Sequence, residues 1–201
     1  MNPFFEFHRE ALDPQIRENV RKTLPMLDEM KDAELREKVI DAWALSLQLN
    51  GWTAIEEMPG SGMPEASAIG DQSMHIKVVM YNALSIYRNL KKAYERDFGL
   101  DEDILMACAA LHDVGKPYEY NRTERPKWVA DDKEYGMPNL RHPSYGVFIC
   151  GVCELPAPVL NVAGYHSRFI KRSAYGEIVH YADDGSWFSL ARLCDLNIPK
   201  L

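Results

Sequence analysis

The segment Leu-His-Asp-Val-Gly-Lys-Pro at 111–117 places a histidine directly before an aspartate, at the end of an apolar stretch with helical spacing. Neighbouring residues inside a helix point about 100° apart, so an interior pair would not converge on one ion. At a helix end the backbone can bend enough for His112 and Asp113 to reach the same metal site. Gly115 permits unusual backbone conformations, and Pro117 prevents the helix from continuing. In a simpler interpretation, His112 only complements the helix dipole and Asp113 caps the next segment.

Other polar side chains of the same kinds also occupy apolar helical stripes or the ends of such stripes. They are His75, His142, His166 and Asp183. Buried polar groups need partners, and a shared metal site would satisfy them all together. Imidazole and carboxylate ligands suit Zn, Fe, Mn, Co or Ni. Six such side chains are too many for one catalytic ion with open positions, and they suit two divalent transition-metal ions bridged by Asp113 and a hydroxide.

Several neighbouring residues have other interpretations. His180 stands on a different face from Asp183, which predicts a position at the surface or behind the ligands. Cys150 and Cys153 have the CxxC spacing of zinc or redox sites, but both lie on an apolar stripe and no second pair exists, so we predict core packing. Lys116, three residues past Asp113, has the simple interpretation of an ordinary cation near a helix C-terminus.

The elements that must position these residues are helices. Apolar residues recur at helical spacing, as at Val79, Ala83 and Ile86, and alternating runs typical of strands are scarce, so the sequence predicts an all-α fold. Residues 53–73 are rich in Pro, Gly and Ser and are predicted to connect an N-terminal helical extension (1–52) to the main domain (74–201). Residues 117–140 contain three prolines and many charges. We predict a long loop there, with a short hairpin at 118–122 and 127–129, that covers the site and contributes to substrate choice.

Composition limits the class of protein. The chain has 201 residues, 46% of them hydrophobic and 26% charged, as in ordinary globular proteins. Its net charge of −7 argues against broad binding to nucleic acid but is compatible with a small anionic substrate in a locally basic pocket. We find no secretory signal and no apolar run of ~18 residues, and the four cysteines are scattered, so we expect a cytoplasmic protein with reduced thiols. Exposed Trp or Phe side chains within 1–50 are candidates for the dimer face of a homo-oligomer.

From about residue 74 to 195 the chain resembles the HD-domain superfamily of metal-dependent phosphohydrolases. The ordered family pattern H…HD…(H…H)…D is matched by His75, His112-Asp113, His142, His166 and Asp183. The two additional histidines resemble those of two-metal members. The segment GYHSR…GEIVHYADD is similar to the ending of HD domains in 3′–5′ exoribonucleases and cyclic-nucleotide phosphodiesterases. Asp184 is an alternative last ligand, and Asp183 is preferred because it follows Ala182 as in that ending.

The resemblance implies a bundle of helices that hydrolyses phosphate mono- or diesters of a small, nucleotide-like or other anionic substrate with a metal-activated hydroxide. Asp113 and Lys116 are then the catalytic residues. Substrate would be bound by Lys116 and by a basic cluster of Arg168, Lys171 and Arg172. Two alternatives stay open. The same ligands resemble those of di-iron HD-domain oxygenases such as myo-inositol oxygenase, and a non-catalytic regulatory domain would keep the fold without the chemistry.

Overall fold

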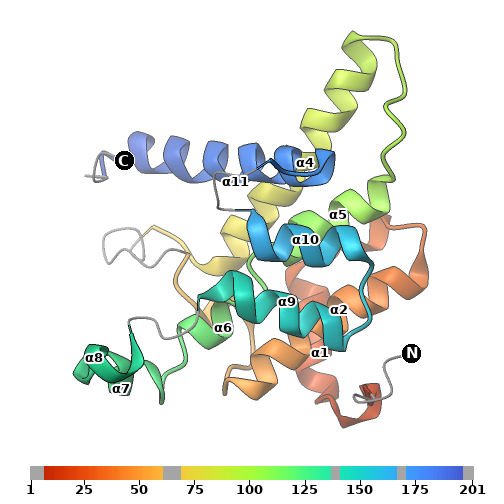
Figure 1. Cartoon of the computed structure of the whole chain (residues 1–201). Helices are drawn as coiled ribbons and strands as arrows, with labels where there is room; N and C mark the ends of the chain where they lie inside the picture. Colours follow the sequence, from red (N-terminus) through yellow and green to blue (C-terminus); the bar gives the residue numbers. More distant parts are fainter. Residues whose placement is uncertain (1–6, 61–68, 137–140, 167–170, 197–201) are drawn as a thin grey trace.

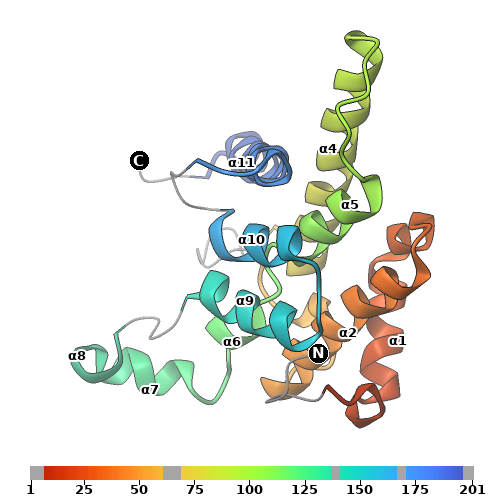
Figure 2. The same ribbon diagram turned by 45° about the vertical axis from the view of Figure 1, so that its right-hand side comes forward.

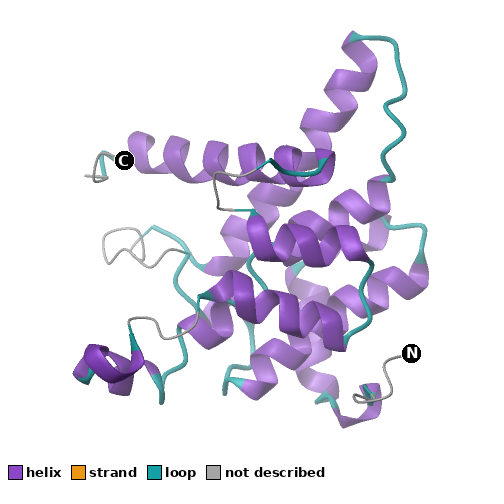
Figure 3. Cartoon of the chain, viewed as in Figure 1, coloured by secondary structure: helices purple, strands orange, loops and turns teal. Residues whose placement is uncertain are grey.

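The computed structural model describes residues 7–60, 69–136, 141–166 and 171–196 (Figure 1). Across these ranges the secondary structure is helical and contains no strand; a single isolated bridge pairs Pro59 with Asp71 (Figure 3). The predicted all-α fold is confirmed. None of the described helices has both the length and the apolar character needed to cross a membrane.

Two N-terminal helices, α1 (Pro14–Thr23) and α2 (Ala33–Leu49), begin at aspartates that cap them. The Asp13 side chain accepts a hydrogen bond from the backbone N–H of Gln15, and Asp32 accepts one from Leu35, which satisfies N–H groups that a helix start leaves unpaired. α2 packs against α1, α5 and α9, and the same hydrophobic core runs from these helices into the rest of the chain.

That continuous core bears on the predicted dimer face. The Trp43 side chain is fully buried, and its indole N–H donates to the backbone carbonyl of Ala110 at 2.9 Å. Phe7 is partly buried against the same core. Neither side chain is therefore available as an exposed aromatic contact, and Phe4 and Phe5 lie outside the described residues.

The body of the bundle consists of α4 (Gln72–Ala93), α5 (Glu102–Leu111), α9 (His142–Val152), α10 (Ala157–Tyr165) and α11 (Ala174–Leu193). α4 packs against α5 and α11, and α10 packs against α9, α5 and α11. Both views show the C-terminal half of α4 extending beyond the other helices (Figures 1 and 2). Cys150 and Cys153 are buried in the core as predicted, and burial raises the pKa of both thiols.

The connector predicted at 53–73 is held at both ends. A short 3-10 turn, Ile55–Glu57, leads to Met58, whose carbonyl accepts a hydrogen bond from the backbone N–H of Gln72 at 3.0 Å. The Asp71 side chain then caps α4 by accepting from the N–H groups of Ser73 and Met74. This fixes the first turn of α4, which carries His75.

The hairpin predicted within 117–140 is wrong. The described part of this segment forms short helices, α6 (Lys116–Glu119), α7 (Arg125–Ala130) and α8 (Asp132–Tyr135), and 137–140 lie outside the described residues. Pro117 and Pro126 stand in the first turns of α6 and α7. Proline is tolerated there because its missing N–H would have had no partner within the helix, so these two prolines begin helices and not a loop.

Candidate metal centre

Helix ends and helix faces bring the six predicted ligands to one place. His112 follows the last residue of α5, and Asp113 lies in the turn after it. His75 stands in the first turn of α4, and His142 begins α9. The last two come from the C-terminal helices, His166 from the end of α10 and Asp183 from the middle of α11.

The six side chains form two groups, each able to hold an ion: His75, His112 and Asp183, and Asp113, His142 and His166. In the first group the Nε2 atom of His75 lies 3.2 Å from Nε2 of His112 and 3.2 Å from Oδ1 of Asp183. In the second, Nε2 of His142 lies 3.3 Å from Nε2 of His166. Such converging nitrogen and oxygen donors are what a borderline divalent ion requires.

The Asp113 carboxylate joins the two groups. Its Oδ1 atom lies 3.1 Å from Nε2 of His142 and 3.6 Å from Nε2 of His166. Its Oδ2 atom lies 3.6 Å from Nε2 of both His75 and His112. One oxygen therefore faces each group, which is the geometry of a bridging ligand.

Hydrogen bonds behind three of the imidazoles orient the rings. Nδ1 of His112 lies 2.7 Å from the carbonyl of Ala109, and Nδ1 of His166 lies 3.2 Å from the carbonyl of Val162. Nδ1 of His142 is bound by the Glu119 carboxylate, which also accepts the His142 backbone N–H at 3.0 Å. Because these acceptors hold the proton on Nδ1, the Nε2 lone pairs face the centre.

Three supporting contacts were missed or left open by the sequence. Gln72 is fully buried and donates from Nε2 to Oδ2 of Asp113 at 2.8 Å. Glu119, whose carboxylate binds His142, lies in the 117–140 segment that was predicted to be a loop. His180 is buried, 7% exposed, with Nδ1 2.7 Å from the carbonyl of His166, so it lies behind a ligand and not at the surface. The signal for Gln72 was its place one turn before His75 on the same helix.

The geometry also separates the two candidates for the last ligand. Asp183 faces His75, whereas the Asp184 carboxylate lies 3.4 Å from Nε2 of His180 and belongs to neither candidate ligand group. Asp183 is thus the better placed of the two for an ion.

The charges around the centre favour metal binding. Burial opposes ionisation of Asp113, but the Lys116 ammonium and nearby imidazoles hold its pKa well below the usual value. Burial, reinforced by Lys116, lowers the pKa of His142 to about 4, and burial lowers the pKa of His112. These imidazoles are therefore neutral at pH 7, the form that binds metal. Burial would lower the pKa of Lys116, but the Asp113 carboxylate outweighs it and raises that pKa.

Gly115 is required for a different reason from the one the sequence suggested. Its φ of −84° is ordinary for any residue. A Cβ atom at this position would lie 2.0 Å from the carbonyl oxygen of His142 and 2.8 Å from the backbone nitrogen of Gly146. The glycine thus permits a close approach between the turn carrying Asp113 and the start of α9, which brings Asp113 to His142.

A hollow of about 210 Å³ opens over the cluster. The described residues that line it are Gly60, His75, Asp113, Lys116, His142, His166, Asp183, Asp184, Trp187 and Phe188. No described residue of 117–136 belongs to this lining, so the prediction that 117–140 covers the site is wrong for that part. The connector, through Gly60, and α11, through Trp187 and Phe188, border the hollow instead.

The predicted substrate cations are not all brought together. Lys116 lines the hollow. Lys171 is exposed, and the Arg172 side chain is 6% exposed with its guanidinium 3.6 Å from the Glu177 carboxylate. Neither contributes to the described lining, and Arg168 lies outside the described residues.

Comparison with known proteins agrees with this geometry. Residues 73–186 match the family model described as HD domain. The chain is 29% identical over 175 residues to the dihydroneopterin 2′,3′-cyclic phosphate phosphodiesterase of Methanocaldococcus jannaschii, an alignment covering 82% of this chain and 68% of that protein. No solved structure gives a significant match.

Proposed function

We propose that this chain, which belongs to the HD domain family and is a metal-dependent phosphohydrolase, uses two divalent ions to hydrolyse a small phosphodiester. The observation that carries the proposal is the division of the Asp113 carboxylate, with Oδ1 facing His142 and His166 and Oδ2 facing His75 and His112. A carboxylate so divided suits two adjacent ions.

The donor set fits such ions. His75, His112 and Asp183 would hold one, His142 and His166 would hold the other, and Asp113 would serve both. When bound, divalent ions supply a water of lowered pKa as the nucleophile and polarise the phosphoryl group. Glu119 and the backbone carbonyls behind the rings keep the imidazoles oriented for this role.

Lys116 acts on the substrate. Its ammonium is held protonated and borders the hollow, where it pairs with a non-bridging phosphate oxygen and offsets the negative charge that develops during hydrolysis. A hollow of about 210 Å³ has room for a phosphate and its nearest substituents. Together with the acidic net charge of −7, this favours a small ester over a nucleic acid.

We propose further that the ester is a cyclic phosphodiester. The support is the similarity, at 29% identity across most of the chain, to a protein named as a phosphodiesterase of a 2′,3′-cyclic phosphate. A five-membered cyclic phosphate is compact, so it matches the size of the hollow.

The test is hydrolysis by protein purified without oxygen, stripped of metal and reloaded separately with Fe²⁺, Mn²⁺, Co²⁺, Ni²⁺ or Zn²⁺. The substrates are a 2′,3′-cyclic nucleotide, an acyclic diester and a monoester. We expect metal-dependent opening of the cyclic ester at the highest kcat/KM, with close to two ions per chain. Preference for the monoester would contradict the proposal that the substrate is a phosphodiester. One ion per chain would contradict the proposal of a two-ion centre. Oxygen consumption without hydrolysis would indicate the di-iron oxygenase instead.

A further inference from the structure

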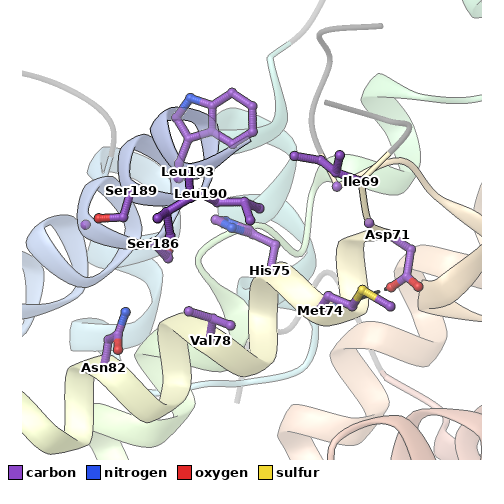
Figure 4. Close-up of a pocket in the computed structure, with 14 residues that line it drawn as sticks. Ile69, Asp71, Met74, His75, Val78, Asn82, Ser186, Ser189, Leu190 and Leu193 are labelled. Carbon is purple, nitrogen blue, oxygen red and sulfur yellow. Dashed lines mark hydrogen bonds between the residues drawn. The ribbon is translucent and has the colours of Figure 1, made fainter. Parts of the chain in front are cut away.

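A second, larger hollow of about 460 Å³ lies between the N-terminal half of α4 and the C-terminal half of α11 (Figure 4). We call it the α4–α11 groove; its described lining is Gly60, Ile69, Gly70, Asp71, Met74, His75, Val78, Asn82, Gly185, Ser186, Trp187, Ser189, Leu190 and Leu193. Its volume is in the range of sites that bind small molecules. The metal ligand His75 belongs to its wall, as it does to the wall of the hollow over the metal centre.

The groove and the hollow over the metals are adjacent. Gly60, His75 and Trp187 line both of them. A substrate with its phosphate at the metals would therefore have the groove beside it for the rest of the molecule. Trp187, shared by both, offers an aromatic face where the two meet.

The walls of the groove are two facing helical stripes. On α4 they are Met74, Val78 and Asn82, spaced four residues apart and thus on one face. Figure 4 shows Val78 and Asn82 directed toward the side on which Ser189 and Leu190 of α11 lie. Met74, Val78 and Leu190 stay 53%, 43% and 40% exposed, which is costly for apolar side chains unless a ligand covers them.

The polar groups of the groove are mostly uncharged. The ionisable side chains among its described lining are His75 and Asp71, and the Asp71 carboxylate already accepts hydrogen bonds from two backbone N–H groups. Asn82 offers both a donor and an acceptor, two turns along α4 from His75, which is about 10 Å at the helical rise. Such walls suit a flat, uncharged ring with polar atoms at its far edge.

We propose that the α4–α11 groove binds an uncharged aromatic or heteroaromatic ring of the phosphodiester substrate and thereby sets specificity. This inference rests on the proposed function. Apolar contacts with Val78 and Leu190 stabilise the ring faces, and Asn82 pairs with its edge. The ring-binding elements are consequently α4 and α11, not the 117–140 segment.

The test compares two cyclic esters that differ in the ring alone. Adenosine 2′,3′-cyclic phosphate carries a base, and glycerol cyclic phosphate has the same five-membered phosphate without one. We expect kcat/KM to favour the nucleotide, and Val78→Arg and Leu190→Arg to reduce that preference at least about tenfold. The matched controls are Tyr81→Arg on α4 and Tyr181→Arg on α11, which are 56% and 65% exposed and outside the described lining, and which should keep the preference.

The outcomes separate the two proposals. Equal hydrolysis of both esters by the unaltered protein, or an unchanged preference in Val78→Arg and Leu190→Arg, would overturn the proposal that the α4–α11 groove binds the ring. The proposed phosphodiesterase activity would still stand. If neither ester is hydrolysed, the proposed function fails. Calorimetry with adenosine alone then decides whether the α4–α11 groove binds a ring. Binding that is lost in Val78→Arg and kept in Tyr81→Arg supports it, and no binding overturns it. Thermal melting and metal content, measured on every variant, identify any that is misfolded.

Discussion

Substituting alanine for Asp113 removes a donor from each half of the metal centre at once. The group containing His142 and His166 falls from three candidate ligands to two, and the group containing His75 and His112 loses the oxygen it shares. Loss of a residue that only orients a ligand costs about 10- to 100-fold in metal affinity, so loss of this shared ligand should cost more than 100-fold for both ions. Activity should fall by several orders of magnitude.

Lys116→Met should behave differently. Methionine keeps much of the stem but removes the ammonium, which the Asp113 charge helps to keep protonated and which is therefore not a metal ligand. The ions should stay, while one charge contact with the phosphate is lost. On the scale of one missing contact to a developing oxyanion, kcat/KM should fall roughly 10²-fold, about 2.7 kcal/mol.

The assay is parallel metal analysis and kinetics on Asp113→Ala, Lys116→Met and Lys92→Met, the last replacing an exposed lysine of α4 outside the described lining of the hollow. Circular dichroism should show the helical fold in all three, since the core does not depend on these side chains. The reasoning is refuted if Asp113→Ala retains two ions, or if Lys116→Met loses them.

Four other variants probe the same centre. His142→Ala and His166→Ala should each lose about one of two ions, measured by elemental analysis; full metal and activity in both would make these histidines structural. Gly115→Ala should destabilise the fold by about 1–3 kcal/mol in urea unfolding, because its Cβ would lie 2.0 Å from a backbone carbonyl oxygen. Gly185→Ala, with nothing within 4 Å of its Cβ, is the control and should not destabilise. Glu119→Gln should weaken metal affinity about 10- to 100-fold in a chelator competition, and unchanged affinity would exclude it from orienting His142.

The candidate ligands could be found from the sequence because each combined a polar side chain with an apolar helical face. That combination is costly unless something pairs with the side chain, so His142 and His166 pointed to a shared partner before any distance was known. The choice of Asp183 over Asp184 depended on resemblance alone. In the structure it follows from α11 turning Asp183 toward His75 and Asp184 toward His180.

The supporting contacts could not be predicted in the same way. Glu119 meets His142 across 23 residues, and Gln72 meets Asp113 across 41. No local periodicity encodes such pairs. The 117–140 segment was predicted wrongly for a further reason. Proline is a strong loop signal but is equally suited to a first helical turn, as at Pro117 in α6 and Pro126 in α7.

The charges of the site imply that phosphate binding depends on the ions. Asp113, Asp183 and Glu119 all have lowered pKa values, despite burial that opposes ionisation, so three ionised carboxylates lie around the Lys116 ammonium. Without metal this surface repels a phosphate, and divalent ions reverse its sign. Calorimetry should therefore show that a chelator abolishes binding of a non-hydrolysable phosphodiester analogue. Binding of adenosine alone should persist, because the α4–α11 groove requires no charge. Undiminished binding of the analogue to metal-free protein would mean that Lys116, not the ions, dominates recognition of the phosphate.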